Sequence, residues 1–373
     1  MPELAFKPAA ELARMISAKK DCIGQSMAAR EGLRNAEQSL FRSVATAYSD
    51  VQRDEQAALI RRNNVRVLSR QLQAATDRFD VGEGTRTDIA QAETRLAAAD
   101  IGLAQADAQL QISRSAYMRR VGHPPVELSI LPTFVIPQTL DAAIYIAREN
   151  NPQLIAAMLN ERAAEAAIDV AKAASRPTIS INGTASTVHK QLSGIQRAET
   201  ATIAAQISIP IFSGGLNRSR VRAAGHARTR SMFETRDTER ALDDAVTQIW
   251  AQLDSARRSL VASRAQVKSA QFAFEGVELE QQVGTRSALD VLNAEQELLN
   301  AKLSEVTAEA AVRETELQLL TTLGAFDAEI GDAHVIFDLL IIGRGPDLSG
   351  HAATEIGDFL RTFVHEQNHH VTL

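Results

Sequence analysis

The sequence predicts a mainly α-helical protein in which long antiparallel coiled-coil hairpins are combined with a short two-stranded β-hairpin. Three observations support this fold class. One segment of the chain occurs twice, each time after a long proline-free stretch. The composition favours long helices over a rounded core, because Ala, Gln, Glu, Arg and Leu dominate and only 4% of residues are aromatic. A single region alternates apolar and polar residues with the two-residue period of a strand.

The internal repeat divides the chain into two similar halves. Residues 81–96 (VGEGTRTDIAQAETRL) match residues 283–298 (VGTRSALDVLNAEQEL), and 283 − 81 gives an offset of 202. No gap is needed over the segment, and a match of this length indicates a tandem duplication. The offset pairs Gly82 with Gly284, Asp88 with Asp290, and Glu93 with Glu295.

Charge, cysteine content and hydropathy exclude several classes of protein. The net charge of −6 argues against a basic nucleic-acid-binding surface, so no nucleic-acid partner is expected. The single cysteine, Cys22, cannot form an intrachain disulfide or a multi-cysteine metal site. No apolar run reaches the roughly 18 residues of a transmembrane helix. The N-terminal residues 1–20 lack the basic start and apolar stretch of a secretory signal. We find no catalytic constellation and expect no cofactor.

The first half contains one helical hairpin, residues 25–122, after an atypical N-terminal segment, residues 1–24. Residues 25–80 contain no proline, and apolar residues recur there at three- and four-residue steps, which predicts a long helix. Gly82 and Gly84 end this helix, and a polar turn leads into a second one. Two helices joined by a short turn are expected to pack as an antiparallel pair.

A connector and a strand pair separate the two hairpins. Residues 123–177 begin with a proline-rich stretch and continue as a helix, in which Pro152 is tolerated near the start. Residues 178–212 then contain two segments with period-two alternation, 178–188 and 202–209, joined by a polar loop. Their length suits a membrane barrel strand of about 9–11 residues, and a soluble hairpin is the alternative.

The second half repeats the hairpin over residues 213–324 and ends in a divergent tail, residues 325–373. Residues 216–282 would span roughly 100 Å as one helix, which needs neighbours along its whole length. The next helix, residues 287–322, carries a coiled-coil seam with three- and four-residue spacing. The seam consists of Leu292, Leu299, Leu303, Val306, Ala310, Leu317 and Leu320. Its equivalent in the first half is Ala90, Ala97, Ile101, Ala104, Ala108 and Met118.

Several short motifs mark this order of elements. They are the repeated Val-Gly turns with their aspartates, Asn151-Pro152, Arg176-Pro177-Thr178, and residues 209–215 (IPIFSGG). Together they resemble the TolC family of outer-membrane efflux and secretion channels, most closely the members that serve type I secretion. The resemblance implies a homotrimer with a β-barrel in outer-membrane lipid and an α-helical barrel in the periplasm. It also implies a passive export conduit with no enzymatic activity.

The resemblance assigns roles to the two hairpin tips. They would contact a periplasmic adaptor (membrane fusion) protein joined to an inner-membrane pump, through Val81, Gly82, Gly84, Thr85, Val283, Gly284 and Thr285. Residues just beyond the tips would line the pore entrance or gate, namely Thr87, Asp88, Arg286, Asp290 and Asn293. Three Asp290 carboxylates around an axis would attract cations, and Arg286 would pair with Thr87 and Asp88 across the hairpins. The alternative is that both aspartates only cap their helices.

The sequence also departs from the family pattern. The offset places the counterpart of the strand pair before residue 1, because 178 − 202 gives −24. We therefore expect an N-terminally truncated member without a signal peptide and with half of the usual strands. The alternative is a soluble periplasmic or cytoplasmic coiled-coil scaffold or adaptor without a pore. In the tail, His365-Glu366-Gln367-Asn368-His369 matches a zinc-hydrolase motif, but only four residues follow it, which favours a plain polar segment.

Overall fold

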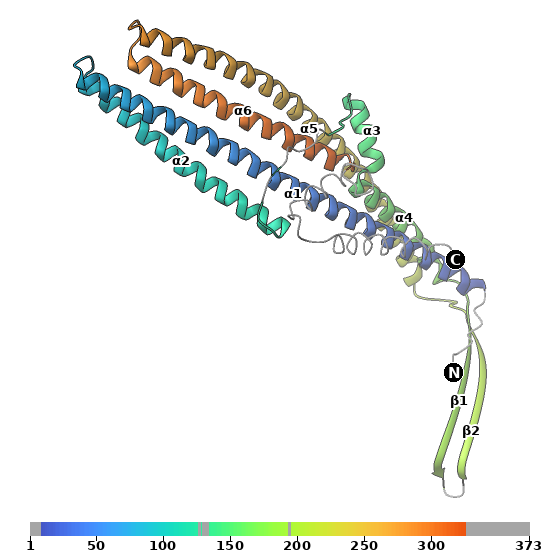
Figure 1. The fold of residues 1–373 in the computed structure, drawn as a ribbon. Helices are drawn as coiled ribbons and strands as arrows, with labels where there is room; N and C mark the ends of the chain where they lie inside the picture. The colour runs from blue at the N-terminus through green and yellow to red at the C-terminus, as the bar shows by residue number, and fades with distance from the viewer. Residues whose placement is uncertain (1–8, 126–127, 129–133, 193–194, 326–373) are drawn as a thin grey trace. The chain divides into compact units, whose positions relative to one another are not determined.

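The computed structural model describes residues 9–125, 128, 134–192 and 195–325 (Figure 1). Long helix pairs and one β-hairpin make up this part of the chain, which confirms the predicted fold class. In chain order the elements are α1 (Ala9–Asp80), α2 (Arg86–Val121), α3 (Leu140–Asn150), α4 (Pro152–Ala173), β1 (Thr178–Leu192), β2 (Ile195–Ser208), α5 (Leu216–Gln282) and α6 (Ala288–Thr322). None of the described helices is apolar over a sufficient length to cross a membrane.

The first helix is longer than the sequence prediction. α1 begins at Ala9, whereas we predicted a start near residue 25. The added stretch contains no proline or glycine before Gly24, and it is rich in alanine and lysine, which have high helix propensity. The mixed composition of the segment therefore did not mark a helix boundary.

The middle helix is two helices. We predicted one helix over residues 140–175 with a tolerated proline, but the chain breaks at Asn151 between α3 and α4. The Asn151 side-chain oxygen accepts hydrogen bonds from the backbone amides of Gln153 and Leu154, at 3.0 and 3.1 Å. Pro152 occupies the first turn, where its missing N–H costs nothing. The Asn-Pro pair is thus a helix start.

The β-hairpin is also longer than predicted. β1 and β2 pair antiparallel from Thr178 opposite Ser208 to Leu192 opposite Ile195, with an irregularity after His189. Most of the predicted loop, residues 189–199, is therefore strand. Alternating apolar residues revealed only the first part of β1 and the last part of β2, whereas the ladder itself requires only backbone partners.

The described chain divides into two compact units. Unit 1 combines the described residues up to Ala36 with Tyr145–Asp244, and unit 2 combines Glu37–Ile144 with the described residues from Ala245 onward. α1 and α5 each contribute one part to either unit.

In unit 1, α4 contacts both α1 and α5. Gly24 of α1 lies so close to α4 that an added Cβ would sit 3.1 Å from the Cβ of Ala163. On the other side, Asn217 of α5 donates a hydrogen bond to the carbonyl oxygen of Ala174, at 3.3 Å. This bond ties the first turn of α5 to the end of α4, where the chain enters and leaves the β-hairpin.

In unit 2, the long helices lie side by side in the order α5, α6, α1, α2 (Figure 1), and α2 also contacts α6. Ion pairs connect the outer pairs, with Arg264 of α5 bound to Glu309 of α6 at 2.7 Å and Arg114 of α2 bound to Glu55 of α1 at 2.7 Å. Small apolar clusters fill the space between the helices. They are Ala47, Tyr48, Val51, Ala58, Leu110 and Tyr117, then Ala45, Phe134, Leu317 and Leu320, and finally Leu68, Ala99 and Leu292.

In the single chain, the predicted coiled-coil seam is buried or half-buried in α6 and exposed in α2. All seven seam residues of α6 are buried or half-buried. Their counterparts in α2, from Ala90 to Met118, are all exposed. The buried residues of α2 are instead Ala92, Ala99, Gly102, Leu110, Ser113 and Tyr117. The difference has a physical cause: α6 lies between α5 and α1, whereas α2 lies at the edge of the unit (Figure 1).

Candidate functional site: the hairpin tips

The two hairpin tips lie at the same end of unit 2 (Figure 1). Each tip turns at a glycine in the left-handed region, Gly82 with φ +83° and Gly284 with φ +79°. The backbone closes both turns in the same way. The amide of Glu83 donates to the carbonyl of Arg78 at 2.8 Å, and the amide of Thr285 donates to the carbonyl of Glu280 at 2.9 Å. The duplication therefore preserves the turn itself, because only glycine adopts this conformation without strain.

A capping box follows each turn and fixes the aspartate beyond it. Thr85 and Asp88 exchange hydrogen bonds between side chain and backbone amide, at 3.2 and 3.0 Å. Ser287 and Asp290 do the same at the same two distances. Both aspartates occupy the first helical turn, as the sequence predicted. Hydrogen bonds from the hydroxyl and the amide of Ser287 lower the pKa of Asp290, so this carboxylate is charged at neutral pH.

Arg286 has a different partner from the one predicted. We expected it to pair with Thr87 and Asp88 across the hairpins. In this chain its Nε donates to Glu280 Oε2 of its own hairpin, at 2.8 Å. This contact raises the pKa of the Arg286 guanidinium further above its usual range. Asp88 is engaged with Thr85.

The contact across the hairpin tips is made by Asn293 of α6. Its Oδ1 accepts a hydrogen bond from Arg95 of α2, at 3.0 Å. Sequence reasoning selected Asn293 and missed Arg95. The repeat gives no signal for this pair, because the offset matches Arg95 with Glu297, a residue of opposite charge. The adaptor-contact residues of the two tips, Val81 and Val283 among them, are mostly exposed.

A buried polar pair lies behind the tips. Asn64 of α1 donates a hydrogen bond to Glu295 of α6 at 3.0 Å, and the two residues are 5% and 8% exposed. Burial raises the pKa of Glu295, although the hydrogen bond from Asn64 acts in the opposite direction. Next to this pair, Leu68 and Leu292 pack together with Ala99. The two hairpins are therefore joined by a polar contact inside an apolar seam.

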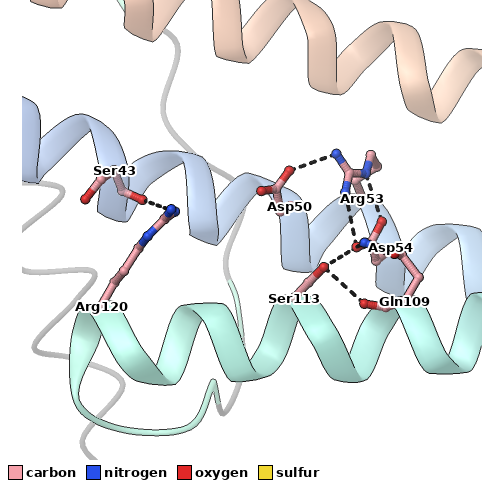
Figure 2. A network of polar contacts seen from close by, with 7 residues as sticks. All are labelled: Ser43, Asp50, Arg53, Asp54, Gln109, Ser113 and Arg120. Carbon is pink, nitrogen blue, oxygen red and sulfur yellow. Dashed lines mark hydrogen bonds and ion pairs between the residues drawn. The ribbon is translucent and has the colours of Figure 1, made fainter.

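Farther from the tips, a polar network joins α1 to α2 (Figure 2). Arg53 binds Asp54 at 2.8 Å and Asp50 at 2.8 Å, and Ser113 of α2 donates to the same Asp54 carboxylate. Gln109 also reaches Asp54, at 3.4 Å. The Asp54 side chain is only 7% exposed. Sequence reasoning missed this network, because an Arg-Asp pair within a long polar helix gives no sign of burial.

The described residues hold no group of three or more His, Cys, Asp or Glu side chains that could bind a metal ion. The histidine motif at residues 365–369 lies outside the described part of the chain.

Paired helical hairpins with matching turns at one end, combined with a strand pair, define a TolC-like channel subunit. The family model for outer membrane efflux proteins matches residues 17–123 and 143–325. The chain therefore belongs to the outer membrane efflux protein family, the TolC family, whose members are non-enzymatic outer-membrane transporters.

Individual relatives agree with this assignment. The chain is 33% identical over 308 residues to the outer membrane efflux protein BepC of Brucella suis, covering 82% of this chain and 67% of BepC. It is 27% identical over 315 residues to the alkaline protease secretion protein AprF of Pseudomonas aeruginosa, covering 78% and 64%. Among solved structures, the open state of the Neisseria gonorrhoeae MtrE outer membrane channel has the same fold. The TM-score is 0.72 at 23% identity, covering 83% of this chain and 72% of MtrE. The chain thus spans about two thirds of the length of these curated relatives.

Proposed function

We propose that this chain is the protomer of a homotrimeric outer-membrane channel, through which an efflux or type I secretion system passes its substrates. The observation that carries the proposal is the arrangement of unit 2. Its two edge helices, α2 and α5, both present apolar residues that nothing in the described chain covers. A further copy on each side would bury them.

The uncovered residues form regular stripes. On α5, Val261, Phe272 and Leu279 are spaced by 11 and 7 residues, which places them on one helix face, and Phe272 is 80% exposed. On α2, Ile101 and Ile112 are also 11 residues apart and exposed. Burial of such stripes against a neighbouring copy is favourable by about 25 cal/mol per Å². Repeated packing of an α2 edge against an α5 edge gives a closed ring when the rotation between copies closes, which three copies achieve with a 120° rotation.

The β-hairpin supports the same assembly. A lone two-stranded hairpin is at best marginally stable, and its outer edges have unpaired backbone groups. Residues 199–208 of β2 and residues 209–212 after it are exposed on both faces. Strands from several copies can pair edge to edge and close into a barrel, which satisfies these backbone groups in a membrane.

The tips then have two roles in the proposed channel. The exposed turn residues 81–85 and 283–285 are the docking surface for a periplasmic adaptor protein that connects the channel to an inner-membrane pump. Asp290, with Asn293, Arg286, Asp88 and Thr87 nearby, lines the entrance. The charged Asp290 carboxylate, repeated three times around the axis, would favour cations there.

The assembly can be tested by fractionation and by one substitution in a stripe. Expressed behind a cleavable secretory signal in a Gram-negative host, the chain should be found in the outer membrane and run as a heat-labile trimer on SDS gels. Phe272→Glu places a charge in the stripe and should abolish the trimer. Val135→Glu is the matched control, because Val135 is 82% exposed in the connector, outside both stripes. A soluble monomeric wild-type chain would favour the scaffold alternative instead.

A further inference from the structure

The place where the β-hairpin meets α5 has an apolar and cationic surface that substrate passage and adaptor docking do not require. We define this junction surface by Ile211, Phe212, Arg176, Arg218, Arg220 and Arg222. We propose that it binds the anionic headgroups of membrane phospholipids such as phosphatidylglycerol. The inference rests on the proposed function, because it requires the strand pair to enter a membrane.

The apolar part of the junction surface directly follows β2. Ile211 and Phe212 are 94% and 90% exposed, among the most exposed large apolar residues of the described chain. They precede the turn at Gly214 and Gly215, both in the left-handed region, and thus lie between strand and helix. Large apolar side chains beside basic residues are typical of segments that lie at a membrane–water interface.

The cationic part begins two residues into α5. Arg218, Arg220 and Arg222 are all exposed. They lie within roughly 6 Å of helix rise, since each residue advances the helix by about 1.5 Å. Arg218 and Arg222 lie on nearly the same side of the helix and Arg220 lies on the opposite side, all within about one helical turn. The headgroups of a membrane leaflet form a layer, so the three cations can reach this layer together although they point in different directions.

A fourth arginine, Arg176, lies near the start of α5. Arg176 is exposed just before β1, two residues beyond Ala174. Asn217 of α5 binds the carbonyl oxygen of Ala174 at 3.3 Å, so the chain entering the hairpin and the chain leaving it are held together. Within the described residues, Arg176, Arg218, Arg220 and Arg222 form no hydrogen bond or ion pair through their side chains.

The next two arginines along α5 have carboxylate neighbours. Arg228 lies 3.7 Å from Glu165, and Arg230 lies 3.1 Å from Glu234. No aspartate or glutamate occurs between residues 200 and 233, a stretch with five arginines. Among these five arginines, Arg218, Arg220 and Arg222, which lie next to the strands, remain available for an external anion. Guanidinium groups bind phosphate oxygens in a bidentate fashion, so a phosphodiester headgroup matches both the charge and the geometry.

The proposal can be tested by lipid binding to the full-length trimer in neutral detergent. The dissociation constant of fluorescent phosphatidylglycerol would be compared with that of the same label on zwitterionic phosphatidylcholine. The test variant is Arg218→Gln/Arg220→Gln/Arg222→Gln. The matched control is Arg230→Gln/Arg236→Gln/Arg240→Gln, which removes three charges from the same helix farther from the strands.

We expect a preference for phosphatidylglycerol that weakens in high salt. Each arginine near a charged membrane surface contributes about fivefold to binding, so the test variant should bind at least tenfold more weakly and the control within about twofold of wild type. Equal losses in both variants, or equal affinities for the two lipids, would overturn the proposal. Displacement of the lipid by millimolar inorganic phosphate would do so too, since it would show a simple anion site. These outcomes leave the trimer intact, whereas failure of the proposed function removes the trimer from the wild type as well.

Discussion

Asn64 and Glu295 form a buried hydrogen bond between residues that are 231 positions apart in the chain. The bond joins the first hairpin to the second, and it lies on the tip side of the unit. The described residues contain no equivalent hydrogen bond at the repeat-related positions. The offset matches Glu295 with Glu93, which is exposed on α2. The duplication thus supplied two glutamates. Only Glu295, on α6, takes part in the contact between the hairpins.

Removing the donor should destabilise the chain. Asn64→Ala leaves a buried carboxylate without this partner, which costs about 1–3 kcal/mol. The free energy of unfolding, measured by denaturant titration of the purified protein, should fall by that amount. Glu93→Gln, at the exposed repeat position, is the control and should change it by less than about 0.5 kcal/mol. Equal effects of the two substitutions would show that the buried hydrogen bond does not contribute to the free energy of unfolding.

The same carboxyl group should make stability depend on pH. Burial raises the pKa of Glu295 above its ordinary value of 4.5, while Lys302 and Arg70 partly oppose the shift. Between the ordinary and the raised pKa, the folded chain keeps a proton that the unfolded chain has lost. Stability contributed by this group is therefore present at acidic pH and is lost as the pH rises through that window.

Glu295→Gln isolates this dependence, because it keeps an acceptor oxygen for Asn64 and removes the titration. The difference in unfolding free energy between wild type and Glu295→Gln should fall with rising pH and then level off above the raised pKa. A difference that is constant from pH 4 to pH 8 would contradict the assignment of the shift to Glu295.

The network around Asp54 should hold α1 against α2. Asp54→Ala removes the shared acceptor of Arg53 and Ser113, and we expect a loss of about 1.5–3 kcal/mol in unfolding free energy. Asp50→Ala removes only a half-exposed partner of Arg53 and should cost less than about 1 kcal/mol. If both losses were equally small, the buried carboxylate would not anchor the helix pair.

Sequence reasoning succeeded where local chemistry decides the structure. Gly82 and Gly284 end their helices, and Asp88 and Asp290 complete the capping boxes of the next ones, because turns and caps depend on a few neighbouring residues. It failed where neighbours in space decide. The offset transferred the seam of α6 to α2, but burial follows the position of each helix in the unit. The partner of Arg286 was missed for a related reason, since the offset matches Glu280 with Arg78 and the two tips differ in charge.

The two capping boxes provide an internal control for the pore entrance. Asp88→Asn and Asp290→Asn each keep an acceptor oxygen and remove one charge, so their effects on helix capping should be equal. Only Asp290 belongs to the proposed acidic ring, in which three copies attract cations. In planar bilayers, Asp290→Asn should therefore reduce the preference for cations over anions, measured from the reversal potential in a salt gradient. Asp88→Asn, at a residue beside that ring, should reduce it clearly less. Equal shifts in the two variants would mean that net charge, and not a ring at Asp290, sets the selectivity of the channel.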